Sequence, residues 1–404
     1  MKRYFNTNKP PWRSLSLSLI MSPMKRTTLI FIIAAIVILA GAYVIRVRND
    51  MTDFGVCYQA GERIVHGETL YRPSDGHLQH KYSPPSALFF SAFTLFPYEW
   101  AKLIWYILEF VFLWGVFSLS IKMLPSPGKN AGMLCFLTFL IMLKFLAREV
   151  ELGQVNIFII LTLTLMLSFL LRKKETAAGL FWGVSLFFKP YALAFLPYFL
   201  IKKRFKPAAV GVAFFIAGLA VPSLFYGLRG NLLVLKEWPT TLSSSTRPLL
   251  AVYDNSSLYA FLFKNLPAYW GQPGVAIAFV LLFLLLGLLL LWMIKSGQAP
   301  GLVHSPEVLE SAFLFIMIPL FSPLGWYYNY LYSLLAMMLI VSAFKKFPLS
   351  LKVILIINFV MISTSLVELW GKTLFHFYTQ HSLVVINFLV VLFGLFYLRL
   401  KKIA

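Results

Sequence analysis

The sequence predicts an all-α polytopic membrane protein, in which a bundle of helices crosses the lipid bilayer many times. Of its 404 residues, 59% are hydrophobic and only 13% are charged, and the mean hydropathy is +0.78. These values lie far outside the range of water-soluble domains. Apolar runs of roughly 17 to 25 residues recur along the whole chain, and each is long enough to cross the hydrocarbon core as a helix.

The apolar runs define the expected helices in chain order. We expect about ten full transmembrane helices and one broken segment, at residues 27–45, 98–121, 131–146, 154–171, 177–200, 207–227, 273–294, 309–324, 326–343, 349–367 and 381–398. Residues 1–26 form a basic cytoplasmic segment, and residues 27–404 form a single transmembrane domain. No small-residue cleavage site follows the first run, so we expect no cleavable signal peptide.

The run at residues 177–200 does not fit a simple alternation of loops across the membrane. Basic residues flank it at 172–174 and at 202–204, and both flanks therefore favour the cytoplasm. A helix of 24 residues rises only about 36 Å, which is enough for one crossing but not for two. We therefore predict a re-entrant pair of short helices, with its turn at Lys189-Pro190.

The distribution of charge sets the predicted orientation. With the amino terminus in the cytoplasm, the cytoplasmic segments carry 22 basic and 3 acidic residues, and the external segments carry 12 basic and 11 acidic residues. Because cytoplasmic loops are rich in Lys and Arg, both termini are expected to be cytoplasmic. This orientation accounts for the formal net charge of +21, which therefore gives no reason to expect a nucleic-acid partner.

Two external loops, residues 46–83 and 227–272, are long and rich in aromatic and polar residues. Such loops commonly carry function. In the first loop, Asp50 and Asp53 closely follow a membrane helix, where a carboxylate can act as a base on a hydroxyl delivered from the water. Spacing alone favours a simpler interpretation, in which both are solvated charges. The two cysteines of the chain provide neither a disulfide framework nor a metal-ligand spacing.

Short motifs follow one another in a defined order along residues 50–345. They are Asp53-Phe54, Tyr58, Ala60, Gly67, Leu70-Tyr71, Tyr82-Ser83-Pro84-Pro85, Gly153-Gln154-Val155-Asn156, Lys189-Pro190, Asn255-Ser256-Ser257-Leu258, Ser322-Pro323 and Trp326. Taken in this order, they resemble the signature of glycosyltransferase family 87, the polyprenol-phosphate-mannose-dependent mannosyltransferases of the GT-C superfamily.

The resemblance implies a GT-C-like helical bundle and a hexosyltransferase, with mannose as the expected sugar. The donor would be a hexose on a polyprenyl phosphate, and Asp53 would be the base of an inverting transfer to an acceptor hydroxyl on the external face. The acceptor would be a glycolipid, a polysaccharide or a protein. No cofactor is implied. A metal is not needed, because the leaving group is a lipid phosphate and the sequence has no Asp-x-Asp pair for a nucleotide sugar.

Further residues are candidates for substrate binding. Because burying an unpaired cation is costly, we expect Lys189 to contact the donor phosphate rather than to snorkel to the interface. The amides of Gln154 and Asn156 can bind sugar hydroxyls or, equally, cap a helix. The resemblance adds Asn255. Several aromatic residues either stack on sugars or belong to an interfacial belt: Tyr58, Tyr71, Tyr82, Trp326 and Tyr328.

Some charged groups have a simpler explanation than substrate binding. Arg148 could contact a phosphate, but a solvated charge cluster with its neighbours Glu149 and Glu151 is the preferred interpretation. Glu109 lies within an apolar run, where pairing with a buried lysine competes with a catalytic role.

The family pattern and this sequence differ in one place. The Ser-Pro-x-Ser-Trp element of the family usually continues into two histidines, whereas here Gly325 replaces the second serine and Tyr328 and Asn329 stand at the histidine positions. No imidazole is therefore available locally for proton transfer near neutral pH. Tyrosine and asparagine can still hydrogen-bond a sugar hydroxyl or a phosphate oxygen, so we expect both residues to bind substrate.

Other function classes remain to be weighed against the transferase. A flippase or transporter of lipid-linked sugars also needs a polar cavity between helices, but the sequence shows no internal symmetry of the kind that transporters carry. A polymerase or ligase of surface polysaccharide is a closer rival. The sequon at Asn255 lies within the predicted site, and this position favours a bacterial cytoplasmic membrane over the endoplasmic reticulum.

Overall fold

The structure, a computed structural model, describes residues 26–124, 130–296 and 305–401. These residues are almost entirely helical, and no β-strand occurs among them. The chain divides into two compact units, residues 1–49 and 50–404. In the first unit, the described residues form α1 (Arg26–Ile45) and the short 3-10 helix η2 (Val47–Asn49).

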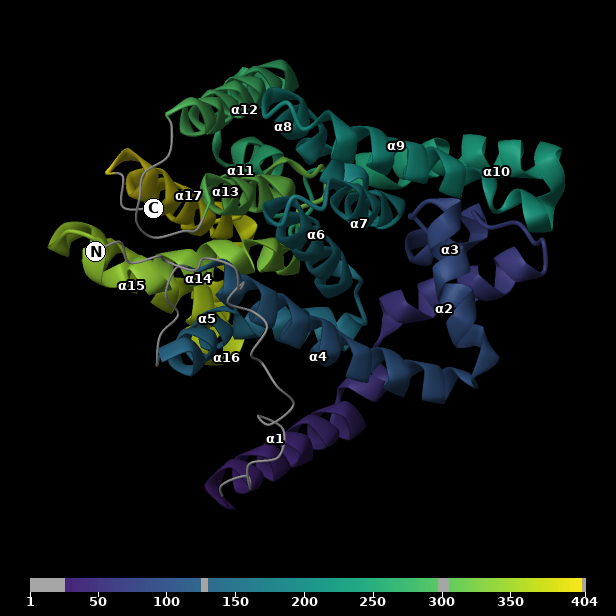
Figure 1. The fold of residues 1–404 in the computed structure, drawn as a ribbon, viewed down its shortest axis with the longest axis horizontal. Helices are drawn as coiled ribbons and strands as arrows, with labels where there is room; N and C mark the ends of the chain where they lie inside the picture. The colour runs from purple at the N-terminus through teal and green to yellow at the C-terminus, as the bar shows by residue number, and fades with distance from the viewer. Residues whose placement is uncertain (1–25, 125–129, 297–304, 402–404) are drawn as a thin grey trace, which may run out of the picture. The chain divides into compact units, whose positions relative to one another are not determined.

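The second unit is a bundle of α-helices with short 3-10 segments at their ends and in the connections (Figure 1). Its elements are α2 (Thr52–Val65), η3 (Pro73–Leu78), α3 (Pro84–Ser91), η4 (Ala92–Leu95), α4 (Tyr98–Met123), α5 (Ala131–Leu152), α6 (Asn156–Leu171), α7 (Glu175–Phe188), η6 (Pro190–Ala194), α8 (Phe195–Ile201), α9 (Phe205–Ala220), α10 (Ser223–Thr246), η7 (Arg247–Leu249), α11 (Leu258–Asn265), η8 (Ala268–Trp270), α12 (Gly271–Lys295), α13 (Pro306–Phe321), η9 (Tyr327–Ser333), α14 (Leu334–Ala343), η10 (Phe344–Lys346), α15 (Leu349–Thr364), α16 (Val367–Gln380) and α17 (Val384–Leu400).

Several helices are suited to a membrane. Within the described residues, four are long and apolar enough to cross it: Tyr98–Met123, Ala131–Leu152, Ala268–Lys295 and Tyr327–Lys346. Two bent pairs, α9 with α10 and α15 with α16, turn by 98° and 103°, and counting each pair as one span gives six. The chain is thus an all-helical membrane protein. Shorter apolar helices such as α6 and α17 occupy further predicted runs, and the predicted total of about ten full crossings stays a prediction.

The run at residues 177–200 is broken at its expected turn. Helix α7 ends at Phe188, and Lys189 is extended, with φ −136° and ψ 114°. The following Pro190 explains the break, because proline has no N–H and disfavours a helical conformation in the residue before it. An ion pair of 3.1 Å between Arg204 and Glu175 joins the two ends of the segment. The ends therefore lie together, as a pair of short helices requires.

A network of ion pairs joins helices that are distant in sequence. Lys202, just after α8, lies 3.0 Å from Glu310 of α13, and Arg399 of α17 lies 3.7 Å from the same carboxylate. Arg204 lies 3.7 Å from Glu307. All five residues belong to the ends that the charge pattern assigns to the cytoplasm, so the structure gathers these ends in one place.

Part of the predicted external loop 46–83 is helical. Helix α2 packs against α3, and the two lie side by side in Figure 1. The packing is close, because a Cβ on Gly61 would lie only 2.8 Å from the backbone of Phe90. The apolar residues that α2 buries include Phe54, Tyr58 and Ile64, and this buried face fixes the position of the first turn of the helix.

Candidate active site

Asp53 lies in the first turn of α2 and is half-buried. The preceding Met51 is fully buried and has φ 44° and ψ 35°, in the left-handed region that side chains with a Cβ rarely adopt. Its backbone N–H donates to the carbonyl of Glu151 at 2.9 Å. Strain of this kind persists where the surrounding structure imposes it, and it is common at active sites. Helix α2 is thus held against the end of α5 at the candidate base.

Gly153 makes the turn between α5 and α6 and has φ 66°. A Cβ at this position would lie 2.7 Å from the Cβ of Phe54. Glycine is therefore required twice, for its conformation and for its close contact with α2. This turn places the next residue, Gln154, against Asp53.

The Gln154 side chain connects three segments of the chain. Its Nε2 donates a hydrogen bond to Asp53 Oδ2, and its Oε1 accepts one from the Tyr82 hydroxyl at 3.3 Å. The Tyr328 hydroxyl lies 3.5 Å from the same Nε2. Residues from α2, from the loop just before α3 and from η9 thus meet around one amide.

The electrostatic surroundings of Asp53 favour a base. Burial raises the pKa of its carboxyl above the usual range, and the hydrogen bond from Gln154 and the positive charges of Lys189 and Lys81 offset part of this rise. Burial lowers the pKa of Lys81, although the charge of Asp53 opposes that shift. A carboxylate with a raised pKa accepts a proton more readily than one in water.

A second cluster lies beside the first. The Lys189 ammonium donates to Asn156 Oδ1 at 2.6 Å and to Asn329 Oδ1 at 3.3 Å. The Asn156 Nδ2 in turn donates to Glu149 Oε2 at 2.7 Å. Asn329 of this cluster directly follows Tyr328, which contacts Gln154 of the first cluster, so the two clusters form one polar site.

The expectation that Glu149 belongs to a solvated charge cluster is wrong. Its side chain is fully buried, and its Oε1 accepts the backbone N–H of Asn156 at 2.6 Å. It thus caps the amino end of α6, and through its other oxygen it holds Asn156 Nδ2, so that Asn156 Oδ1 accepts from Lys189. The other charges of the cluster pair with each other, because Arg148 lies 2.8 Å from Glu151 and 3.5 Å from Asp50.

The sequence contains a feature that could have predicted the capping role of Glu149. The residue stands one helical turn before Gly153, a residue type that often ends a helix. The next helix begins at Asn156, and a carboxylate on the last turn of one helix can reach the N–H groups that open the next. Lys81, the other charge near Asp53, carried no comparable signal.

Asn255 holds two loops together. Its Nδ2 donates to the carbonyls of Leu250 and Pro323, both at 2.9 Å, and its Oδ1 accepts the N–H groups of Ser257 and Gly325, both at 3.0 Å. A further β-bridge joins Asn255 to Trp326. The amide of this predicted binding residue is therefore engaged by backbone groups.

Two of the predicted aromatic residues use their hydroxyls within the fold. Tyr58 donates to the carbonyl of Phe96 at 3.0 Å, and Tyr71 donates to the carbonyl of Tyr82 at 2.6 Å. Both rings are buried. Among the candidates from the sequence, the structure thus brings together one group, consisting of Asp53, Tyr82, Gln154, Asn156, Lys189, Tyr328 and Asn329. The predicted candidates that lie outside this group are Tyr58, Tyr71, Asn255 and Trp326.

Comparison with known proteins gives one match. The family model described as glycosyltransferase family 87 matches residues 80–323, which is more than half of the chain. The matched region includes Tyr82, Gln154 and Lys189, whereas Asp53 precedes it and Tyr328 follows it. No match was found among curated proteins, and none among solved structures.

Proposed function

This chain belongs to glycosyltransferase family 87, and from this premise we propose that it transfers a hexose, specifically mannose, from a polyprenyl-phosphate donor to an acceptor hydroxyl. The transfer takes place on the external face of a bacterial cytoplasmic membrane, and the acceptor is a glycolipid, a polysaccharide or a protein. The observation that carries the proposal is the half-buried Asp53, with its raised pKa, in one polar site with Lys189.

Asp53 is proposed as the base of an inverting displacement. Its Oδ2 is bound by Gln154, and its Oδ1 accepts no hydrogen bond from the described residues. The free oxygen takes the proton of the acceptor hydroxyl while that hydroxyl oxygen forms a bond to the anomeric carbon. The bond between the anomeric carbon and the phosphate oxygen breaks, and the lipid phosphate leaves with the electron pair. The configuration at the anomeric carbon is thereby inverted.

Lys189 is proposed to bind the departing phosphate. Its ammonium is held by the neutral side-chain carbonyls of Asn156 and Asn329. Within the described residues no carboxylate oxygen lies in salt-bridge contact with it. A cation that is fixed in this way can stabilise the negative charge that develops on a leaving phosphate. Tyr328 and Asn329 would contact the donor or acceptor by hydrogen bonds rather than by proton transfer.

The orientation in the membrane follows from the charge pattern. We propose about ten full crossings with both termini in the cytoplasm, because the basic residues gather at the cytoplasmic ends. The ion-pair network of Lys202, Arg204, Glu307, Glu310 and Arg399 supports this orientation, since it joins ends that all carry the cytoplasmic signature.

A transfer assay with radiolabelled polyprenyl-phosphate-mannose tests the proposal. In membranes that contain the protein, label should pass covalently to an acceptor. Asp53→Asn keeps the size of the side chain but removes the proton acceptor, so the rate should fall at least ~100-fold while the donor still binds. The matched control is Asp50→Asn. Asp50 lies in the same segment and pairs with Arg148, and its replacement should have only a mild effect on the rate. Movement of the donor across the membrane without covalent transfer would support a flippase instead, and full activity of Asp53→Asn would exclude Asp53 as the base.

A further inference from the structure

A lysine lies within an apolar helix without an acidic partner. Lys144 belongs to α5, one of the four helices that are long and apolar enough to cross a membrane. Its ammonium donates to the Ser365 hydroxyl, and within the described residues no carboxylate lies in salt-bridge contact with it. A cation in the bilayer is costly unless it is paired, and such a residue commonly marks a functional site. None of the roles proposed above uses Lys144.

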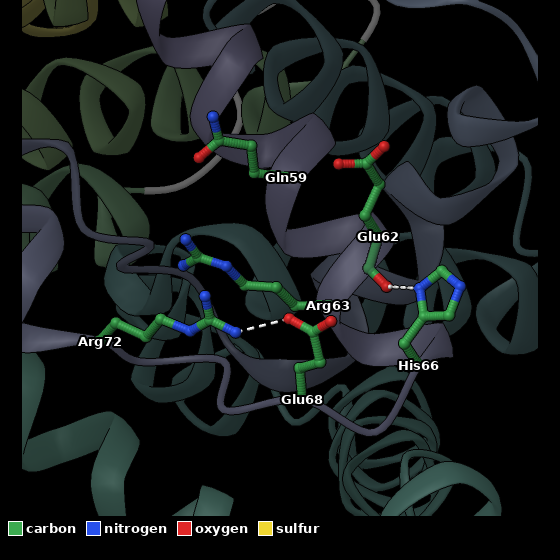
Figure 2. Close-up of a pocket in the computed structure, with 6 residues that line it drawn as sticks. All are labelled: Gln59, Glu62, Arg63, His66, Glu68 and Arg72. Carbon is green, nitrogen blue, oxygen red and sulfur yellow. Dashed lines mark hydrogen bonds and ion pairs between the residues drawn. The ribbon is translucent and has the colours of Figure 1, made fainter.

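Other basic side chains of the structure have the partner that Lys144 lacks. In the polar pocket at the end of α2, Arg72 pairs with Glu68 at 2.5 Å (Figure 2). Arg399, which lies in the apolar helix α17, is buried and reaches Glu310 at 3.7 Å. In both cases the chain itself neutralises the charge. The charge of Lys144 is not neutralised in this way, so it can pair with an anion from outside the chain.

The surroundings of Lys144 hold its ammonium in place. The ammonium lies 4.8 Å from the centre of the Phe145 ring and 5.5 Å from the centre of the Tyr378 ring. Tyr378 is buried and donates to Asn387 of α17, whose Nδ2 donates to Asn358 of α15 at 2.7 Å. This network exists before any ligand binds, and a preorganised site loses less conformational entropy on binding.

The cluster lies at the bend between α15 and α16. Helix α15 ends at Thr364, and α16 turns away from it by 103°. A helix at about a right angle to a membrane-crossing helix runs along the membrane surface. The exposed residues of α16 are mixed in character, as is typical of helices at the membrane interface: Leu369, Leu374, Phe377, Glu368, Lys372 and His376. Under the proposed orientation, Ser365 thus lies at the external interface, at the level of the lipid head groups.

The helices beside Lys144 also present an apolar surface. Leu140 and Leu143 of α5 are exposed, as are Ile357 and Val360 of α15. The two helices pack against each other. A phospholipid has a matching order of parts, because its phosphate lies at the interface and its acyl chains lie deeper in the membrane. Inorganic phosphate would meet the charge but would leave this surface uncovered.

We propose that Lys144 binds the phosphate of an anionic phospholipid from the outer leaflet. Lys144 supplies the positive charge, and Ser365 and the two aromatic rings position its ammonium. The described part of the cluster offers no carboxylate to the ammonium group of a zwitterionic lipid, and this favours a lipid with net negative charge. The bound lipid joins α5 to α16. This inference goes beyond the proposed sugar transfer and does not depend on it.

Thermal unfolding of the purified full chain in nanodiscs of defined composition tests this inference. The reference is phosphatidylcholine, and phosphatidylglycerol is the anionic probe. A lipid that binds only the folded chain stabilises it, so the melting temperature of the wild type should rise by about 3 °C as phosphatidylglycerol is added. Lys144→Met keeps an apolar side chain without the charge and should lose this rise. Each variant is compared with itself in phosphatidylcholine, so a general loss of stability does not affect the result.

Two further variants serve as controls. Lys144→Arg keeps a positive charge and should keep most of the rise in melting temperature. Lys372→Met removes the same charge from an exposed position of α16, and it should respond to phosphatidylglycerol as the wild type does. Equal loss of the response in Lys372→Met and Lys144→Met would assign it to the general charge of this face and would overturn the site at Lys144.

Other probes distinguish the possible sources of the phosphate. Inorganic phosphate added to phosphatidylcholine nanodiscs should leave the melting temperature unchanged. A lysine that only snorkels into water would give no response to phosphatidylglycerol in the wild type, and that result would overturn the inference. A response that depends on Lys144 with polyprenyl phosphate but not with phosphatidylglycerol would assign the residue to the lipid carrier and would likewise overturn it. None of these results would bear on Asp53-dependent transfer, which is measured separately.

Discussion

The hydrogen bond from Gln154 opposes the effect of burial on the pKa of Asp53. The two influences act on the same carboxyl, and burial is the larger, so the pKa stays above the usual range. A base must be deprotonated to act, and its activity is therefore lost as the pH falls through its pKa. Under the proposed mechanism, the amide of Gln154 therefore influences the acid limb of the pH profile.

Replacing Gln154 with leucine should move that limb. Gln154→Leu removes a hydrogen bond that favours the charged form, so the pKa of Asp53 rises further and the acid limb of kcat/KM shifts to higher pH. Lys81→Met removes a nearby positive charge and should shift the limb in the same direction. The measurement is the rate of sugar transfer as a function of pH. Gln380→Leu, on the exposed surface of α16, is the matched control and should leave the limb in place. A limb that stays fixed in Gln154→Leu would belong to another group.

Tyr328 and Asn329 stand where the resemblance leads us to expect histidines, and both join the polar site through Gln154 and Lys189. If they bind substrate and transfer no proton, Tyr328→Phe and Asn329→Ala should raise KM severalfold and change turnover at saturation much less. Steady-state kinetics with varied donor and acceptor decide this. Histidine at both positions should not increase activity on the protein's own substrate. A large gain from that double substitution would show that an imidazole still has a role at this site.

Among the elements, sequence patterns predicted membrane helices better than the helices of the external segments. The uniformly apolar runs and the break at Lys189-Pro190 could be predicted from the sequence, because the length of an apolar run and the geometry of proline determine them. Helix α2 was treated as part of a loop because its composition is mixed. Its buried residues Phe54, Cys57, Gly61 and Ile64 nevertheless recur every three or four residues, and this helical spacing could have revealed it. Contacts such as that of Gln154 with Asp53, 101 residues apart, could be anticipated only through the family resemblance.

The turn between α13 and η9 leaves no room at Gly325 for the serine that the resemblance leads us to expect there. A Cβ there would lie 2.7 Å from the backbone nitrogen of Ser257 and 2.8 Å from the carbonyl oxygen of Pro319. Gly325→Ser restores the family residue, yet it should destabilise the protein by about 1–3 kcal/mol through overpacking. Thermal unfolding in detergent measures this loss. The same change at Gly287 of α12, where no atom lies within 4 Å of the added Cβ, should have little effect. Equal melting temperatures for the two variants would contradict the steric explanation.

At the scale of the whole molecule, two polar regions are assigned to opposite sides of the membrane. Asp53, Gln154 and Lys189 belong to the site assigned to the external side, and the ion-pair network around Glu310 belongs to the side assigned to the cytoplasm. The charge pattern predicts which ends belong to each side, because it depends only on the order of basic and apolar residues. It could not give the partner of each charge, which depends on how distant helices pack.

The segment between Glu175 and Arg204 provides a direct test of this arrangement. The ion pair between these residues holds both ends of the segment together. A re-entrant pair of helices likewise requires both ends to face the same compartment. A single crossing would place them on opposite sides. In a background without the native cysteines, Lys174→Cys and Lys203→Cys, both at exposed positions, should resist a membrane-impermeant thiol reagent added to intact cells. Both should react once the membrane is opened.

Glu237→Cys, at an exposed position of α10 on the predicted external side, is the control and should react in intact cells. Labelling of positions 174 and 203 from opposite sides would show that the segment crosses the membrane once. In that case the basic flanks do not both lie in the cytoplasm, and every predicted loop after residue 200 changes sides. Asp53 and Tyr328 would then lie in opposite compartments, which conflicts with the hydrogen bonds of both residues to Gln154. The structure therefore requires that the two positions label from the same side.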